Sequence, residues 1–180
     1  MRTKVVGLGA WCDYVTEDEF RKTFADPRVT AKQVEYSVKD DRLGSRSPFP
    51  SIVTADQVEQ VEQAVKEFRR GLHFRVEEFA TLSDGRRLVL TDDRGWGSSG
   101  PRGVGRDGLW AYETVETIES TVRNVVLPDD AEETGEEHPW TWLAERIRAL
   151  GVETTPEELR QLPYDVVLSD RLRTRLTRGG

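Results

Sequence analysis

Cysteine and histidine are scarce in this sequence, which limits the reactive and metal-binding centres it can build. The chain has one cysteine, Cys12, and two histidines, His73 and His138. A single thiol excludes an intramolecular disulfide and is typical of a reducing compartment. A closed zinc site needs a full tetrahedron of nitrogen or sulfur ligands, and a nucleophilic cysteine needs a neighbouring base. We expect neither, and we expect Cys12 to pack as a small apolar residue.

Long apolar runs are also absent. The longest ones are short, such as Val125-Val126-Leu127, whereas a membrane-spanning helix needs about 18 or more apolar residues in succession. The N-terminal residues meet Trp11, Asp13 and an acidic run at 17–19 too early to form the apolar part of a secretory signal. The sequence therefore predicts a cytoplasmic protein that does not insert into membranes.

The usual glycine motifs of nucleotide sites and hydrolases are missing too. Gly7 and Gly9 lack the third glycine of a dinucleotide fingerprint, and the glycines within 92–108 lack a following Gly-Lys-Ser/Thr ending. No Gly-x-Ser-x-Gly nucleophile elbow occurs. The aspartate pairs at 40–41, 92–93 and 129–130 do not have the spacing of a calcium loop. We therefore predict no catalytic residue, no cofactor site and no metal site.

Basic residues are fewer than acidic ones, and the formal net charge is −7 at pH 7. Nucleic-acid-binding proteins usually present a net basic face, so we expect no nucleic-acid partner. An acidic chain is instead compatible with a basic protein partner, because opposite fields speed their encounter.

Apolar periodicity and turn signals divide the first half of the chain into short elements. Residues 4–11 are predicted to form a short strand. Thr16 with Glu19 forms a capping box, which predicts the start of a short helix. Residues 32–39 alternate as a half-buried strand does. Valine, phenylalanine and leucine then recur at helical spacing, which predicts a helix over 55–70.

A hairpin is predicted next, with its turn at Asp84-Gly85 and a bulge near Phe79, where the alternation changes phase. Residues 92–108 are rich in glycine and are expected to form a long connection, after which 109–112 resume as a strand. We expect the hairpin and this strand to form an antiparallel meander with the 32–39 strand at one edge.

The last third of the chain is predicted to be mainly helical. Thr114 caps a helix that ends before Pro128, residues 129–137 form an acidic link, and a helix covers 140–150. Thr155-Pro156 opens a short helix, and Ser169 caps a last one. Residues 164–168 fit a strand and a helix equally well.

These elements predict an α+β fold, in which helices pack a small antiparallel sheet of three to five strands and C-terminal helices follow. We expect an α+β core over 1–128 and a C-terminal helical extension over 129–180, packed on the same domain.

The 92–108 connection is our first candidate for an interaction surface, because long loops in compact domains are often functional. Tryptophan and arginine are favoured at binding hot spots, so Trp96 is a candidate anchor. In the alternative, Trp96 folds back over the sheet. Trp140 and Trp142 cannot share one helix face, which leaves one of them a candidate for contact. The candidate residues are Asp92, Asp93, Arg94, Trp96, Arg102, Glu132, Glu133 and Trp142.

Two segments are similar to small uncharacterised proteins of actinobacteria. They are Leu82-Ser83-Asp84-Gly85-Arg86-Arg87 leading to Gly95-Trp96-Gly97, and His138-Pro139-Trp140-Thr141-Trp142-Leu143. The resemblance covers about the last hundred residues. It implies no activity.

Three hypotheses about function follow. The first is a non-enzymatic protein-interaction module, whose specific version is an immunity-type inhibitor of a basic toxin. The second is an enzyme with a loop-borne carboxylate site. The third is a small-ligand sensor with a pocket under the glycine-rich connection.

Overall fold

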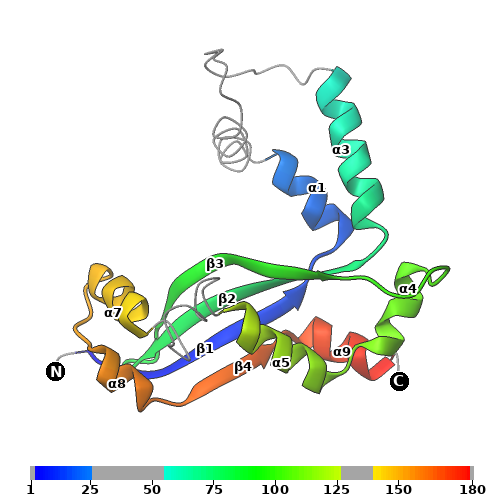
Figure 1. Ribbon diagram of the computed structural model, residues 1–180. Coiled ribbons are helices and arrows are strands. Elements are labelled where there is room, and N and C mark those ends of the chain that lie inside the picture. The colour runs from blue at the N-terminus through cyan, green and yellow to red at the C-terminus, as the bar shows by residue number, and fades with distance from the viewer. Residues whose placement is uncertain (1–2, 26–54, 127–139, 179–180) are drawn as a thin grey trace.

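A single mixed sheet of four strands organises the molecule, as a computed structural model shows for residues 3–25, 55–126 and 140–178, the part of the chain that it describes. The strands lie in the order β3-β2-β1-β4 (Figure 1). Their bounds are β1 (Val5–Tyr14), β2 (Leu72–Leu82), β3 (Arg87–Ser98) and β4 (Tyr164–Leu168). The predicted α+β class is confirmed.

The strand pairing corrects one part of the prediction. β1, β2 and β3 pair antiparallel, with Gly85 at positive φ in the β2–β3 turn, but β4 runs parallel to β1. The segment 164–168, which the sequence left open, is thus a strand, and the sheet is mixed. β4 runs parallel because the chain returns through α7 and α8 to the end where β1 begins (Figure 1).

The helices begin where the capping signals predict. Thr16 and Glu19 form a reciprocal cap on α1, and Thr155 with Glu158 forms the capping box of α8. The Ser169 hydroxyl accepts a hydrogen bond from the Leu172 amide and so caps α9. The described helices are α1 (Glu17–Ala25), α3 (Ala55–Phe68), α4 (Arg106–Leu109), η1 (Trp110–Tyr112), α5 (Val115–Val125), α7 (Trp140–Ala149), α8 (Pro156–Arg160) and α9 (Asp170–Arg178).

Both hydrophobic clusters of the core lie on the same face of the sheet. Ala10 and Cys12 of β1 pack in one cluster with residues of η1, α5 and α9. Leu8, on the same face of β1, packs in the other cluster with residues of α7 and α8. Cys12 is buried in the first cluster, in agreement with the apolar role that we predicted for it.

Helices α1 and α3, which we call the arm, project from one end of the sheet on the side away from α5 and α9 (Figure 1). Phe20 of α1 stacks on Phe68 of α3 with the ring centroids 4.3 Å apart. Glu17 receives two hydrogen bonds from Arg69, of 2.6 and 2.8 Å. The helix predicted over 55–70 is confirmed as α3.

Two expectations about the middle of the chain are wrong. β3 continues to Ser98, so much of the predicted 92–108 connection is strand, and 109–112 are helical in α4 and η1 rather than a strand. Gly95 and Gly97 pair with β2 in register, but glycines have no side chain to display an alternation in the sequence. The predicted strand over 32–39 and the acidic link over 129–137 lie outside the described residues.

Gly9 leads to a first prediction. A Cβ atom added there would lie 2.5 Å from the Asp165 carbonyl oxygen and 2.8 Å from Phe79 Cζ. We expect Gly9→Ala to lower the free energy of unfolding by about 1–3 kcal/mol, because overpacking displaces β4 or the Phe79 ring. Gly7→Ala is the matched control, since its nearest neighbour would be 3.9 Å away. Urea denaturation of both variants measures the difference, and equal stabilities would contradict this packing.

Candidate interaction surface

The face of the sheet opposite the two core clusters, which we call the open face, is covered by no helix among the described residues except where the arm rises at one end (Figure 1). The strand register identifies its residues, because paired residues point to the same face. They include Gly7, Gly9, Trp11, Asp13, His73, Arg75, Glu77, Phe79, Thr81, Arg87, Val89, Gly95, Gly97, Asp165 and Val167, with Asp92 and Asp93 in the β3 bulge opposite Glu77.

The centre of the open face is apolar and aromatic. Trp11 pairs with Val167 of β4, and Phe79 pairs with Val89 of β3. The Phe79 ring lies against Gly9, which has no side chain to hold it off the sheet. Val89 is 43% exposed, and Trp11 and Val167 are half-buried. An apolar centre of this kind on a sheet is typical of a contact surface.

Two arginines cover the rings of this centre. The guanidinium carbon of Arg87 is 4.2 Å from the Phe79 ring centroid, and that of Arg75 is 5.2 Å from the Trp11 ring centroid. Phe79 is only 3% exposed despite its place on the open face. The guanidinium groups thus help to shield the rings from water, and the apolar area that a partner could still bury is mainly that of Trp11, Val89 and Val167.

The charged residues of the open face include both signs, with the acids in excess. Arg75 and Arg87 are the bases, and Glu77 and Asp165 are acids that project from the same face. The exposed acids Asp92 and Asp93 lie in the β3 bulge opposite Glu77. A further acid, Asp13, is buried and ion-paired. The exposed part of the open face therefore has more acids than bases, in the same sense as the net charge of −7 of the whole chain.

Asp13 belongs to a buried joint at the end of β1 rather than to the exposed part of the open face. Its carboxylate accepts hydrogen bonds from Arg171 Nε and Ser169 Oγ, each 2.6 Å long. Arg171 also donates to the Tyr14 carbonyl oxygen at 2.6 Å and to both Glu19 oxygens at 3.0 Å. Burial opposes ionisation of Glu19, but the hydrogen bonds from Arg171 and Thr16 lower its pKa to about 2. The joint ties α9 to α1 and has a structural role.

A second buried polar group lies beneath the helices, on the covered face of the sheet. The Tyr164 hydroxyl donates a 3.2 Å hydrogen bond to Glu78 Oε1 across β1, where the paired residue is the small Ala10. Glu78 is 1% exposed. Burial raises its pKa to about 7, and the Tyr164 hydrogen bond and the charge of Arg94 only partly oppose this. The group has a proton affinity suited to acid–base work, but a substrate has no direct access to so buried a carboxyl group.

The thiol and the described histidine are not arranged for chemistry. Burial, reinforced by the charge of Asp13, raises the pKa of Cys12 to about 12, so the thiolate is not formed near neutrality. The His73 ring stacks on Phe68 at 4.4 Å, and its Nε2 donates to the Phe68 carbonyl oxygen at 3.2 Å. Within the described ranges, no group of three or more His, Cys, Asp or Glu side chains is placed to hold a metal ion.

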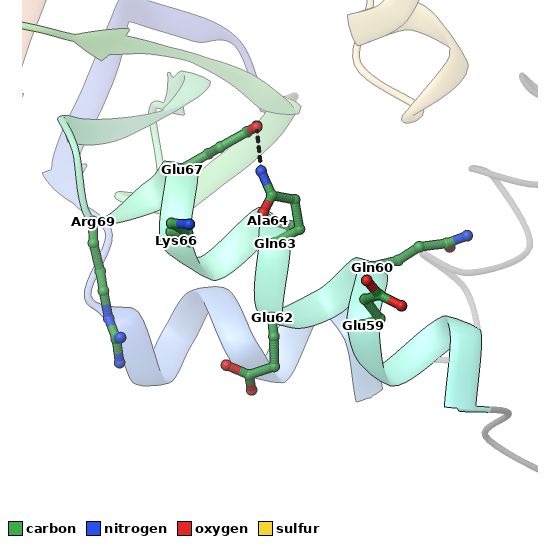
Figure 2. Close-up of a pocket in the computed structure, with 8 residues that line it drawn as sticks. All are labelled: Glu59, Gln60, Glu62, Gln63, Ala64, Lys66, Glu67 and Arg69. Atoms are coloured by element: carbon green, nitrogen blue, oxygen red, sulfur yellow. Dashed lines mark hydrogen bonds between the residues drawn. The ribbon is translucent and has the colours of Figure 1, made fainter.

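The hollow drawn in Figure 2 runs along the arm and does not form an enclosed site. Its lining residues come from α3 and the residue after it, and the hydrogen bond drawn joins Gln63 to Glu67 of the same helix. One helix presents a convex surface, so it cannot surround a ligand as a binding pocket does.

The residues predicted from the sequence lie in several places. Asp92 and Asp93 are exposed on β3, Arg94 is half-buried there, and Arg102 is exposed beyond the end of β3. The Trp96 ring stacks on Phe74 at 4.6 Å on the helix-covered face. Trp142 is 44% exposed while Trp140 packs on the core, as their spacing predicted. Glu132 and Glu133 lie outside the described residues. The contact role of these residues stays a prediction.

Sequence reasoning missed the residues at the centre of the open face. The signal was present in β1, where Leu8, Ala10 and Cys12 alternate with Gly9, Trp11 and Asp13. The alternation indicates two faces, but it does not say that helices cover only the first. The change of phase at Phe79 does predict a bulge, and the structure has register shifts on either side of Glu78, as a bulge produces.

Comparison with family models, with curated proteins and with solved structures finds no match. This agrees with the resemblance described above, which is to uncharacterised proteins and implies no activity. Among the described helices, none is long and apolar enough to cross a membrane.

Proposed function

We propose that this protein is a non-enzymatic protein-interaction module of the cytoplasm, and that it binds its partner through the open face of the sheet. The observation that carries this proposal is the apolar centre formed by Trp11, Phe79, Val89 and Val167, over which no described helix packs. Aromatic and arginine side chains together are the types that dominate protein interfaces.

A protein partner suits this surface better than a nucleic acid does. Binding to a phosphate backbone requires a run of basic side chains, whereas Arg75 and Arg87 of the open face are accompanied by Glu77 and Asp165. The net charge of −7 adds long-range repulsion of a polyanion.

The immunity-type reading, with a basic toxin as partner, is supported by the net charge alone. Such a toxin would meet Arg75 and Arg87 on the open face together with acids such as Glu77 and Asp165, so only part of the contact would be attractive. We therefore keep this hypothesis as an alternative.

Site-specific cross-linking tests the proposal. A photoreactive benzophenone residue in place of Val89 should give discrete protein cross-links in cells of the source organism, because Val89 lies in the proposed interface. The same residue in place of Tyr112, which is 60% exposed in η1, is the matched control and should give few. Adding Trp11→Ala to the Val89 variant should weaken the cross-link about tenfold or more, as loss of a buried aromatic anchor does. Equal labelling from both positions, or no cross-linked protein at Val89, would reject the open face as the binding surface.

A further inference from the structure

We infer that the partner segment on the open face is an amphipathic helix of another protein, with basic residues along one of its flanks. The inference rests on the proposed function, since it names the kind of segment that binds to that surface. A row of apolar side chains and the acids beside it carry the inference.

The apolar side chains of the open face form an oblique row across all four strands, which we call the apolar diagonal. Val167 lies beside Trp11, and Phe79 lies beside Val89. Trp11 pairs with Glu77, so Phe79 and Val89 stand two residues further along the strands. With strands about 4.8 Å apart and a rise of about 3.3 Å per residue, Val167 and Val89 are about 16 Å from one another. About ten residues of helix, or three turns, span this length.

The backbone of the bound segment favours a helix. Strands form their ladder hydrogen bonds within the plane of the sheet, so a segment that lies on the face of a sheet receives none of them. Its own buried N–H and C=O groups must then pair with one another, as they do in a helix. A facing sheet would be wider than the apolar diagonal and would bury the neighbouring acids without partners. Helices already cover the other face of this sheet in the same way.

The side of the apolar diagonal nearer the arm is acidic. Glu77 is half-buried there, and Asp92 and Asp93 are exposed in the β3 bulge opposite it. Within the described ranges, no ion pair engages these three carboxylates, whereas the neighbouring Arg75 is already paired. Lysine and arginine side chains are long enough to reach from the apolar face of a helix to such carboxylates. A helix with basic residues on this flank therefore matches the surface in apolarity and in charge.

The other side of the apolar diagonal and the arm set the limits of the helix. Asp165 and Arg87 lie on that other side, and their opposite signs favour neither charge in the partner. The arm follows the end of β1 at Tyr14 (Figure 1), about 10 Å along the strand from Trp11. A helix has a radius of about 5–6 Å with its side chains, so it fits on the apolar diagonal beside the arm.

Cross-link mapping tests the shape of the bound segment. Benzophenone residues in place of Val89 and, in a second variant, of Val167 should attach to the same segment of the partner, because these positions lie at opposite ends of the apolar diagonal. Mass spectrometry of the cross-linked peptides should place the two attachment sites about ten residues apart, as a helix requires, whereas an extended segment requires about five. Lysine or arginine residues should occur on one flank of the mapped helix.

Charge reversal tests the acidic side. The mapped segment, made as a fluorescent peptide, should bind the full chain in an anisotropy titration, and Asp92→Lys/Asp93→Lys should raise its dissociation constant about tenfold or more. Glu116→Lys/Glu153→Lys makes the same charge change on exposed residues outside the open face and is the matched control. At about 0.15 M salt, screening should keep the effect of the control below about twofold.

The outcomes separate this inference from the proposed function. Attachment sites about five residues apart, a mapped segment without basic residues, a mapped peptide that does not bind, or equal effects of the test and control variants overturn the helix. They leave the proposed function standing, because Val89 still cross-links to another protein. No attachment at Val89, or attachment only within this chain, rejects both. Circular dichroism reports whether the lysine variant folds. If it does not, Asp92→Asn/Asp93→Asn decides, with an expected rise of about threefold or more in the dissociation constant.

Discussion

Replacing Arg171 with alanine is expected to lower the free energy of unfolding by about 3 kcal/mol. Asp13 has a side chain only 3% exposed, and Arg171 is its 2.6 Å partner. Removal of one member of a buried ion pair costs about 3–5 kcal/mol, because the remaining charge stays buried without compensation. We take the lower end of that range, since the Arg171 side chain is 36% exposed and Arg75 remains near Asp13.

A control on the same helix separates this effect from a general loss of helix stability. Arg173 is exposed and donates one hydrogen bond, to the Leu168 carbonyl oxygen at 3.2 Å. Arg173→Ala should therefore cost about 1 kcal/mol or less. Urea denaturation measures both variants, and a double-mutant cycle with Asp13→Ala should show strong coupling for Arg171. Additive effects of Asp13→Ala and Arg171→Ala would show that the joint does not act as a unit.

The stability of the protein is expected to fall as the pH rises from about 5 to about 8, because of Glu78. Burial raises the pKa of this carboxyl group from 4.5 to about 7, so the folded state binds more protons than the unfolded state between these values. A group with a raised folded-state pKa stabilises fully below its unfolded value and loses that contribution as the pH rises through the folded value. Since one pKa unit corresponds to about 1.4 kcal/mol, the loss amounts to about 3 kcal/mol.

Glu78→Gln should remove this dependence. The glutamine amide does not titrate, and its oxygen can still accept the hydrogen bond from the Tyr164 hydroxyl. The variant should therefore be more stable than the wild type at pH 8. Burial lowers the pKa of His73, so this group makes the protein more stable as the pH rises. His73 is present in both proteins, so its contribution cancels when the two profiles are subtracted. Thermal or urea unfolding at a fixed protein concentration measures the two profiles. Parallel profiles would show that Glu78 does not titrate in this range.

Local signals in the sequence predicted most of the individual elements. Thr16, Thr155 and Ser169 cap helices as expected, and Asp84-Gly85 forms the hairpin turn. These features depend on residues within a few positions of one another, so a single sequence contains the information. The extension of β3 through Gly95 and Gly97 was missed, because its pairing depends on β2 and not on residues nearby in the chain.

The sequence predicted that one of two neighbouring tryptophans is exposed, but it did not predict where the candidate surface lies. The spacing of Trp140 and Trp142 showed that they face different ways, and the structure has Trp142 exposed. Trp96 was a candidate because it lies among glycines, yet its ring stacks on Phe74. Trp11 drew no such attention, because it stands in a short strand beside Cys12, where a core position is the ordinary expectation.

The sequence by itself determined the secondary structure of the capped helices and of the hairpin, the scarcity of reactive side chains and the acidic net charge. Only the tertiary structure decided that β4 pairs parallel with β1, that Glu78 is buried, and that described helices cover one face of the sheet while Trp11 and Phe79 occupy the other. The physical reason is that alternation along a strand tells which residues share a face. What packs on each face depends on segments far away in the chain, and that is settled only when the chain folds.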